Sequence, residues 1–193
     1  MKSEIIKLNK IFKKYLSIKE INDIIIFGSI MKGKESPNDI DILIIFNKKI
    51  NKKIEQEIRR ELNNRYEINS ITKEELDKDI YKAKEGLYLE GYSFSSQKFL
   101  KEKIGFESIA YLKYNLKNVK GSLRVRFYYS LIGRGKEKGF LSTIKATKFS
   151  ENIIVCEYSE IEKLKKYFEN WNIEYKIYPS LIPKRLYPII LKK

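Results

Sequence analysis

The residues best suited to carry chemistry are two aspartates, Asp39 and Asp41, that open a strongly apolar run. Side chains on a strand alternate between faces, so both carboxylates would point the same way, about 7 Å apart along the backbone. Carboxylates this close repel each other, and burial would raise the pKa of one of them unless a cation lies between them. Hard oxygen ligands suit Mg²⁺, and water and substrate phosphates complete the coordination shell of this ion. The pair therefore predicts a divalent metal site.

A Gly28-Ser29 pair precedes these aspartates, at the end of the apolar run Ile24–Phe27, and is predicted to open a helix. Exposed backbone N–H groups at such a start bind phosphate, and glycine lets the phosphate come close. Lys32 and Lys34 follow and are placed either to neutralise triphosphate oxygens or to face solvent. These residues favour metal and nucleotide binding. The alternative is a strand–turn–strand whose acids are merely solvated.

The elements that must position these residues follow from the spacing of apolar side chains. Short β-branched runs predict strands over 24–27, 39–46 and 66–71, with a further short strand at 92–94. Apolar residues at helical spacing predict helices over 3–16 and 52–63. A third helix is expected after Thr72, where Glu75 completes a capping box. The alternation of strands and helices predicts an α/β (α+β) fold class.

On these residues the chain resembles the nucleotidyltransferase superfamily related to DNA polymerase beta, in its minimal nucleotidyltransferase form. The family pattern is a hydrophobic residue, Gly, then Gly or Ser, a short spacer, and Asp-hydrophobic-Asp/Glu-hydrophobic. Phe27-Gly28-Ser29 and Asp39-Ile40-Asp41-Ile42 match that pattern throughout. The resemblance covers about residues 1–95 and implies a mixed sheet with flanking helices.

The resemblance also implies roles for particular residues. Members of this superfamily usually carry a third carboxylate on a later strand, and Glu67 in Tyr66-Glu67-Ile68-Asn69 is our candidate; the alternative is an exposed acid at a strand edge. Lys32-Gly33 stands where Lys/Arg and Gly often follow the Gly-Ser pair. The implied sites are catalytic and metal-binding (Asp39, Asp41, Glu67) and nucleotide-binding (Gly28, Ser29, Lys32), with two Mg²⁺ ions as cofactors and an NTP as substrate.

Basic residues are concentrated in the second half of the chain. The 40 Lys/Arg and 25 Asp/Glu give a net charge of +15, to which residues 1–90 contribute +3 and residues 91–193 contribute +12. A codon bias toward lysine would raise both halves alike, so the asymmetry favours a nucleic acid or another polyanion as partner. The candidate nucleic-acid-binding residues are Arg124, Arg126, Arg134 and Lys136.

Secondary structure is harder to predict in this half. Ile109, Leu112 and Leu116 suggest a helix, followed by a turn and a second helix over 122–132, and such a pair would resemble a helix-turn-helix. Alternation at 123–127 leaves a strand there as the alternative. A strand at 153–155, a helix at 161–171 and a strand at 173–177 predict a βαβ-like unit. We expect a catalytic domain over 1–95 and a basic acceptor-binding or nucleic-acid-binding domain over 96–193.

Composition excludes several classes of protein. The chain has no histidine, which excludes Ser-His and Cys-His nucleophile pairs and His-ligated zinc. Its single cysteine, Cys156, cannot form an internal disulfide, which favours a reducing compartment. The longest apolar runs are far shorter than the ~20 residues needed to span a bilayer. We therefore expect a soluble cytoplasmic protein that does not bind membranes.

Taken together, the sequence predicts a Mg²⁺-dependent enzyme that transfers NMP from an NTP to a hydroxyl of a macromolecular acceptor, with nucleic acid favoured, and releases pyrophosphate. One alternative is a non-catalytic nucleic-acid-binding protein, or an antitoxin-like partner of another protein, that retains the fold. An aminoglycoside-type transferase is disfavoured because a cationic drug would require an acidic acceptor pocket.

Overall fold

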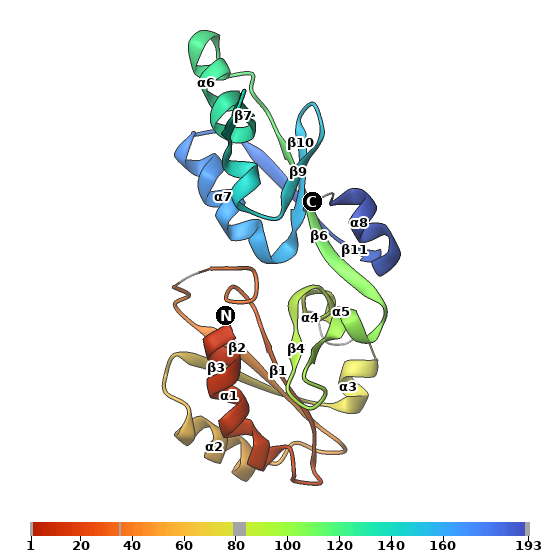
Figure 1. Ribbon diagram of the computed structural model, residues 1–193. Coiled ribbons are helices and arrows are strands. Elements are labelled where there is room, and N and C mark those ends of the chain that lie inside the picture. Colours follow the sequence, from red (N-terminus) through yellow and green to blue (C-terminus); the bar gives the residue numbers. More distant parts are fainter. Residues whose placement is uncertain (1, 35, 79–83, 192–193) are drawn as a thin grey trace. The chain divides into compact units, whose positions relative to one another are not determined.

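The computed structural model describes residues 2–34, 36–78 and 84–191, and the chain divides into two compact units, Met1–Ile104 and Gly105–Lys193 (Figure 1). We call these the N-terminal unit and the C-terminal unit. Each has its own main sheet. The expected fold class, a mixed sheet with flanking helices followed by a smaller α/β part, is confirmed. Within the described ranges, every helix is too short or too polar to cross a membrane.

The N-terminal unit is built on a five-stranded sheet with helices on both faces. Its strands are β1 (Ile21–Phe27), β2 (Ile40–Phe46), β3 (Tyr66–Thr72), β4 (Tyr92–Ser93) and β5 (Lys98–Phe99), in the order β3-β2-β1-β4-β5. Its helices are α1 (Lys2–Tyr15), α2 (Lys52–Glu61), α3 (Lys73–Asp77), α4 (Lys84–Glu90) and α5 (Leu100–Lys103). Strands β2 and β3 run parallel and the other pairs antiparallel, so the sheet is mixed. A parallel pair needs a crossover connection, and α2 lies in it.

The two faces of this sheet bury alternate residues of its strands. On one face, residues of β1 and β2 join those of α1 and α2 in a single core: Leu8, Phe12, Ile24, Ile26, Ile42, Ile44, Ile54 and Ile58. On the other face, a second cluster contains Ile25, Leu43, Ile45, Ile71 and Leu87. Because successive side chains point to opposite faces, Asp41 lies on the same face as Leu43 and Ile45.

The C-terminal unit carries a four-stranded antiparallel sheet in the order β11-β6-β10-β9. These strands are β6 (Phe106–Tyr114), β9 (Ala146–Ser150), β10 (Ile153–Glu157) and β11 (Tyr175–Pro183); β7 (Gly133–Arg134) and β8 (Glu137–Lys138) form a separate hairpin. The helices are α6 (Gly121–Ile132), α7 (Ile161–Asn170) and α8 (Tyr187–Ile190), with 3₁₀ turns η1 (Phe140–Thr143), η2 (Tyr158–Glu160) and η3 (Lys184–Leu186). The predicted elements of the βαβ-like unit form as β10, α7 and β11, with β6 between the two strands.

Aromatic side chains fill the core between this sheet and its helices. Phe127 of α6 and Phe168 of α7 are fully buried, with ring centroids 5.7 Å apart, and Tyr114 of β6 lies 5.9 Å and 5.2 Å from them. A smaller cluster of Ile109, Val155, Ile182 and Leu191 also includes side chains from α8.

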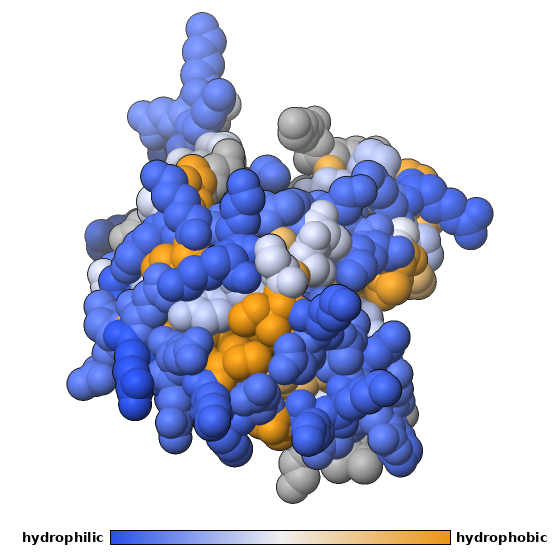
Figure 2. Space-filling model, turned by 90° about the horizontal axis from the view of Figure 1, so that it is seen from below, coloured by the Kyte–Doolittle hydropathy of each residue, from blue (hydrophilic) through white to orange (hydrophobic). Residues whose placement is uncertain are grey.

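Hydrophilic residues cover most of the molecular face in Figure 2, which also exposes a patch of apolar residues near its centre.

The helix expected around residues 109–116 is wrong, because residues 106–114 form strand β6. This strand is central in its sheet and is covered on both faces, so Ile109, Ala110 and Leu112 are all fully buried. Burial on both faces removes the alternation that identifies a strand, and the remaining spacing resembles a helix. The helix-turn-helix is therefore also wrong. The predicted second helix is confirmed as α6, so the alternative strand at 123–127 is not formed.

The boundary between the units lies nine residues beyond the expected division at residue 95, between Ile104 and Gly105. Strand β4 pairs with β1, and β5 pairs with β4, so the chain completes the first sheet before it leaves the N-terminal unit. The charge shift that placed the boundary starts earlier, because Lys98, Lys101 and Lys103 belong to the N-terminal unit.

Candidate active site

Strand β2 positions the two aspartates at one end of the N-terminal sheet. Asp41 is its second residue and pairs with Phe27, the last residue of β1, while Asp39 lies just before the strand begins. Asp41 is partly buried and Asp39 is exposed. Leu43 and Ile45, which follow Asp41 on the same face of β2, are buried in the core. Their packing fixes the strand directly after Asp41.

Glu67 lies directly beside Asp41 on the neighbouring strand. In the parallel pairing of β2 with β3, Asp41 is opposite Glu67, and Leu43 is opposite Asn69. Residues directly opposite in a sheet share a face, so Glu67 lies on the face that carries Asp41. Glu67 is exposed. The register therefore brings the three acids predicted from the sequence to one edge of the sheet.

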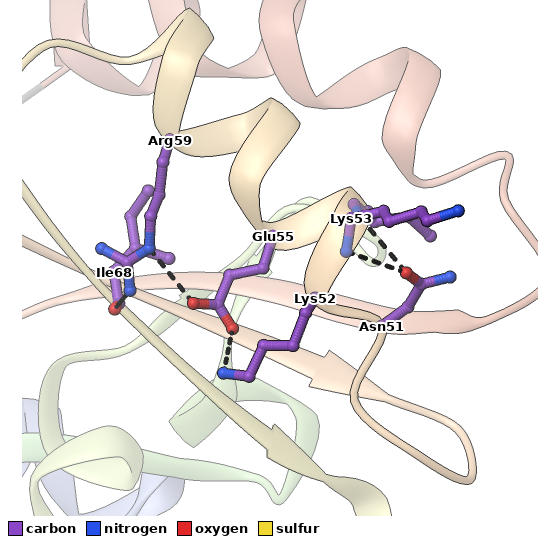
Figure 3. A network of polar contacts seen from close by, with 7 residues as sticks. Asn51, Lys52, Lys53, Glu55, Arg59 and Ile68 are labelled. Carbon is purple, nitrogen blue, oxygen red and sulfur yellow. Dashed lines mark hydrogen bonds and ion pairs between the residues drawn. The ribbon is translucent and has the colours of Figure 1, made fainter.

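Polar contacts from α2 support strand β3 next to Glu67 (Figure 3). The side chain of Asn51 caps the helix by accepting hydrogen bonds from the backbone N–H groups of Lys53 and Ile54. Glu55 then forms ion pairs with Lys52 at 3.0 Å and with Arg59 at 3.1 Å. The Arg59 guanidinium also donates to the carbonyl of Ile68, the residue after Glu67. These contacts tie the crossover helix to the strand that carries the third acid.

Gly28 is required at its position by both conformation and space. Its φ of +83° lies in the left-handed region, which side chains with a Cβ disfavour. A Cβ placed on Gly28 would also overlap the Oδ2 atom of Asp41. The glycine of the sequence motif therefore leaves room for the carboxylate itself.

The segment after Gly28 forms consecutive tight turns in place of the expected helix. The N–H groups of Met31 and Lys32 donate to the carbonyls of Gly28 and Ser29, and that of Gly33 donates to Ile30. No helix is assigned to residues 28–33. Among the hydrogen bonds of the described residues, none uses the N–H of Ser29 or Ile30. Such open N–H groups beside a cationic side chain suit an anion.

Glu90 is a buried acid of this site that sequence reasoning missed. It ends α4 with only 5% exposure. Its Oε1 accepts the Gly28 N–H at 2.9 Å, and its Oε2 lies 3.4 Å from the Lys32 ammonium. Burial raises the pKa of Glu90 to about 7, against the opposing effect of Lys32. The sequence does contain a signal, because Glu90 lies three residues after Leu87 and therefore on the buried side of the same helix.

Burial and neighbouring charges alter the ionisation of Asp41. The pKa of Asp41 is raised, first by burial and then by the charges of Asp39 and Glu67, and Lys32 opposes the rise. This edge of the sheet therefore carries more negative charge than its own cations neutralise. A divalent cation would remove that imbalance.

The donor atoms fit a hard metal ion by chemistry. Asp41 and Glu67 are partners in the register of β2 with β3, and Asp39 precedes β2; carboxylate oxygens of this kind are the ligands that Mg²⁺ prefers. Across residues 2–34, 36–78 and 84–191, no three acidic or cysteine side chains are placed closely enough to hold a metal. We treat Asp39, Asp41 and Glu67 as the candidate ligands because Asp41 and Glu67 are paired in register and Asp39 precedes β2.

The four candidate nucleic-acid-binding residues of the C-terminal unit lie on α6 and on the β7–β8 hairpin that follows it. Arg124 lines a cavity of about 550 Å³ together with Lys117, Lys120 and Tyr128. Arg126 is exposed on the same helix, and the Arg134 guanidinium lies 4.9 Å from the centre of the Tyr129 ring. Lys136 is exposed in the turn between β7 and β8.

Comparison with known proteins gives one result. The family model described as "Polymerase beta, Nucleotidyltransferase" matches residues 6–103, which is half of the chain and nearly all of the N-terminal unit. No curated protein and no solved structure matches the chain. The matched range contains the Gly-Ser turn, all three carboxylates and Glu90. The chain therefore belongs to the polymerase beta nucleotidyltransferase family.

Proposed function

We propose that this protein is a Mg²⁺-dependent nucleotidyltransferase that moves NMP from an NTP to a hydroxyl of a macromolecular acceptor, with nucleic acid favoured, and releases pyrophosphate. The observation that carries the proposal is the strand register that pairs Asp41 with Glu67. Asp39 lies two residues before Asp41, and the Asp41 carboxylate lies against Gly28. Family membership supports the reaction class.

Three carboxylates would hold the metal. Asp39 and Asp41 would bind both ions, and Glu67 would complete the second position or take the proton of the attacking hydroxyl. Bound Mg²⁺ would supply charge neutralisation on the triphosphate and a lower pKa for the acceptor hydroxyl. Burial first, and then the charges of Asp39 and Glu67, raise the pKa of Asp41, and bound ions would relieve the repulsion among these acids.

The turn after β1 would hold the triphosphate. Gly28 and Ser29 would bind the β- and γ-phosphates through the backbone, beside the open N–H groups of Ser29 and Ile30. Lys32 would contact the phosphate oxygens. Its side chain is 30% exposed while its ammonium is paired with buried Glu90, so it is held at the site but remains accessible to a ligand.

The C-terminal unit would bind the acceptor. It carries 18 basic and 8 acidic residues, and its net charge of +10 suits a polyanion. Arg124, Arg126, Arg134 and Lys136 are the proposed contacts. The alternative function is a nucleic-acid-binding or antitoxin-like protein without turnover. It is favoured by the finding that the described acids do not converge as metal ligands.

Incubation of the full chain with each labelled NTP, Mg²⁺ and total RNA, DNA or protein tests the proposal. We expect one acceptor class to become labelled, and Asp39→Asn and Asp41→Asn to abolish labelling without unfolding the protein. Glu57→Gln is the matched control, because it removes an exposed acid from α2, away from the proposed ligands. Undiminished transfer by both aspartate variants would contradict the proposal. Tight binding of nucleic acid without affinity for NTP or Mg²⁺ would favour the alternative.

A further inference from the structure

Two adjoining cavities open in the C-terminal unit where strand β6 ends. Their volumes are about 550 Å³ and 620 Å³, within the range of ligand-binding pockets. They share four lining residues, which we call the ridge: Tyr114, Asn115, Lys117 and Asn152. A ligand longer than one cavity can therefore cross the ridge and occupy both.

The ridge is held in place by hydrogen bonds to neighbouring segments. The Tyr114 and Asn115 N–H groups donate to the carbonyls of Asn152 and Glu174, each at 3.0 Å. The Tyr114 hydroxyl donates to the Glu151 carbonyl at 3.0 Å, and the Asn115 side chain accepts the Lys117 N–H. The surface is thus preformed, and little ordering is needed when a ligand binds.

Five cations line the two cavities. Lys117, Lys120 and Arg124 line the first, and Lys113, Lys117 and Lys176 line the second. None of the five forms an ion pair in the described part of the chain. Two acids, Glu151 and Glu174, also line the cavities and leave an excess of three positive charges. The start of α6, at Lys120 and Gly121, adds its partial positive charge to the wall of the first cavity.

Tyrosine rings lie among these cations. Tyr128 lines the first cavity, and the Lys148 ammonium is 5.3 Å from the centre of its ring. Tyr175 and Tyr178 line the second, and Tyr178 is 50% exposed. Alternating cations and accessible aromatic rings are the combination by which proteins bind single strands, because the cations contact phosphates and the rings stack on bases.

We propose that the two cavities bind a single strand of nucleic acid that crosses the ridge, with Lys117, Lys120 and Arg124 on its phosphates and Tyr178 stacked on a base. A small anion would need one cluster of cations, whereas these cations extend along two cavities. The rings favour unpaired bases over a duplex, in which the base faces are already stacked. The identification of this strand as the acceptor rests on the proposed function, but the binding itself does not.

The test is fluorescence anisotropy of the full chain with labelled single strands of about 12 nucleotides, without NTP and with EDTA. RNA and DNA strands of one sequence form separate arms, and a duplex and heparin are the competitors. The cavity variant is K117Q/K120Q/R124Q. The control variant, K166Q/K184Q/R185Q, removes two lysines and one arginine that are exposed and line neither cavity.

We expect the cavity variant to bind at least about tenfold more weakly and to lower the slope of log affinity against log salt by about 2, since each phosphate contact on a single strand contributes about 0.7. The control variant should change affinity much less. Tyr178→Ala should weaken oligonucleotide binding several-fold and leave heparin binding unchanged, because heparin has no bases.

Equal losses in the two triple variants would overturn the proposal, because binding would then follow net charge alone. Equal affinity for duplex and single strand, or no effect of Tyr178→Ala, would also overturn it. Absent transfer activity with intact cavity-dependent binding would contradict only the proposed function. Transfer activity without cavity-dependent binding would contradict only this inference.

Discussion

The two units use their charged side chains in different ways. In the N-terminal unit, several lysines and arginines are paired with acids, as in Lys14–Glu61 at 2.6 Å, Lys32–Glu90 and Arg59–Glu55. In the C-terminal unit, residues 108–136 contain seven basic residues and no acid. Paired charges fix the positions of helices, strands and turns, whereas unpaired charges remain available to a ligand.

The difference also appears in the acids. Asp39, Asp41 and Glu67 are placed on one edge although their charges repel, and burial together with this repulsion raises the pKa of Asp41. Such an arrangement is unfavourable for folding and is typical of functional sites. The candidate site of the N-terminal unit carries a local cluster of negative charge, while the positive charge of the C-terminal unit extends over a longer surface. The following predictions test whether these two surfaces are independent.

The largest effect is expected for Asp41→Asn. Because it removes a proposed metal ligand, transfer should fall about a thousandfold, while affinity for oligonucleotides stays unchanged. The melting temperature in EDTA should rise, since the variant relieves the repulsion from Asp39 and Glu67. Thermal denaturation, transfer assays and anisotropy measure the three quantities. A parallel loss of transfer and oligonucleotide binding would show that the two surfaces are not independent.

Replacement of Gly28 should have the next largest effect. Gly28→Ala introduces strain at a positive φ and an overlap with Asp41, and should lower the free energy of unfolding by about 2–4 kcal/mol. Gly105→Ala is the matched control, since Gly105 has a φ of +75° but no atom near its added Cβ. It should lose only about 1 kcal/mol. Chemical denaturation compares the two variants, and equal losses would refute the overlap.

Glu90 should make stability depend on pH. Its folded pKa of about 7 exceeds the ordinary value of 4.5, so the folded state binds the proton more tightly, and its contribution to stability falls as pH rises from about 4.5 to 7. Relative to Glu90→Gln, the wild type should therefore lose about 2–3 kcal/mol across this range. Glu85→Gln, an exposed change in the same helix, is the control. Parallel pH profiles of wild type and Glu90→Gln would exclude this role.

The smallest expected effects are those of replacing single lysines, and they should differ between a lysine in an ion pair and one without a pair among the described residues. Lys14→Gln breaks the ion pair with Glu61 and should lower the free energy of unfolding only slightly, because solvent screens an exposed pair. Lys120→Gln breaks no such pair and should leave that free energy unchanged or slightly raised, while it weakens oligonucleotide binding. Urea denaturation at low salt measures both. A larger loss for Lys120→Gln would mean that the cavity cations support the fold.

Much of the N-terminal unit is predictable because its signals are local. The strands predicted at 24–27 and 39–46 form as β1 (Ile21–Phe27) and β2 (Ile40–Phe46), and the Thr72-Glu75 capping box forms as expected. The helix expected around 109–116 is wrong because strand β6 is buried on both faces and so lacks the alternation of a strand. The helix expected after Gly28-Ser29 is wrong because residues 28–33 form turns, although a glycine at a phosphate-binding turn often precedes a helix. Local patterns thus fail where burial depends on neighbours distant in sequence.

By itself, the sequence determined which residue types could perform nucleotidyl transfer, which strands carry them and where positive charge accumulates. The tertiary structure alone decided that Glu67 lies opposite Asp41, that Glu90 is buried beside Gly28 and Lys32, and that five cations line the two cavities that share the ridge. The physical reason is the separation along the chain over which each kind of interaction acts. Periodicity and capping act over a few residues, whereas strand register, burial and charge pairing depend on side chains brought together from distant parts of the chain.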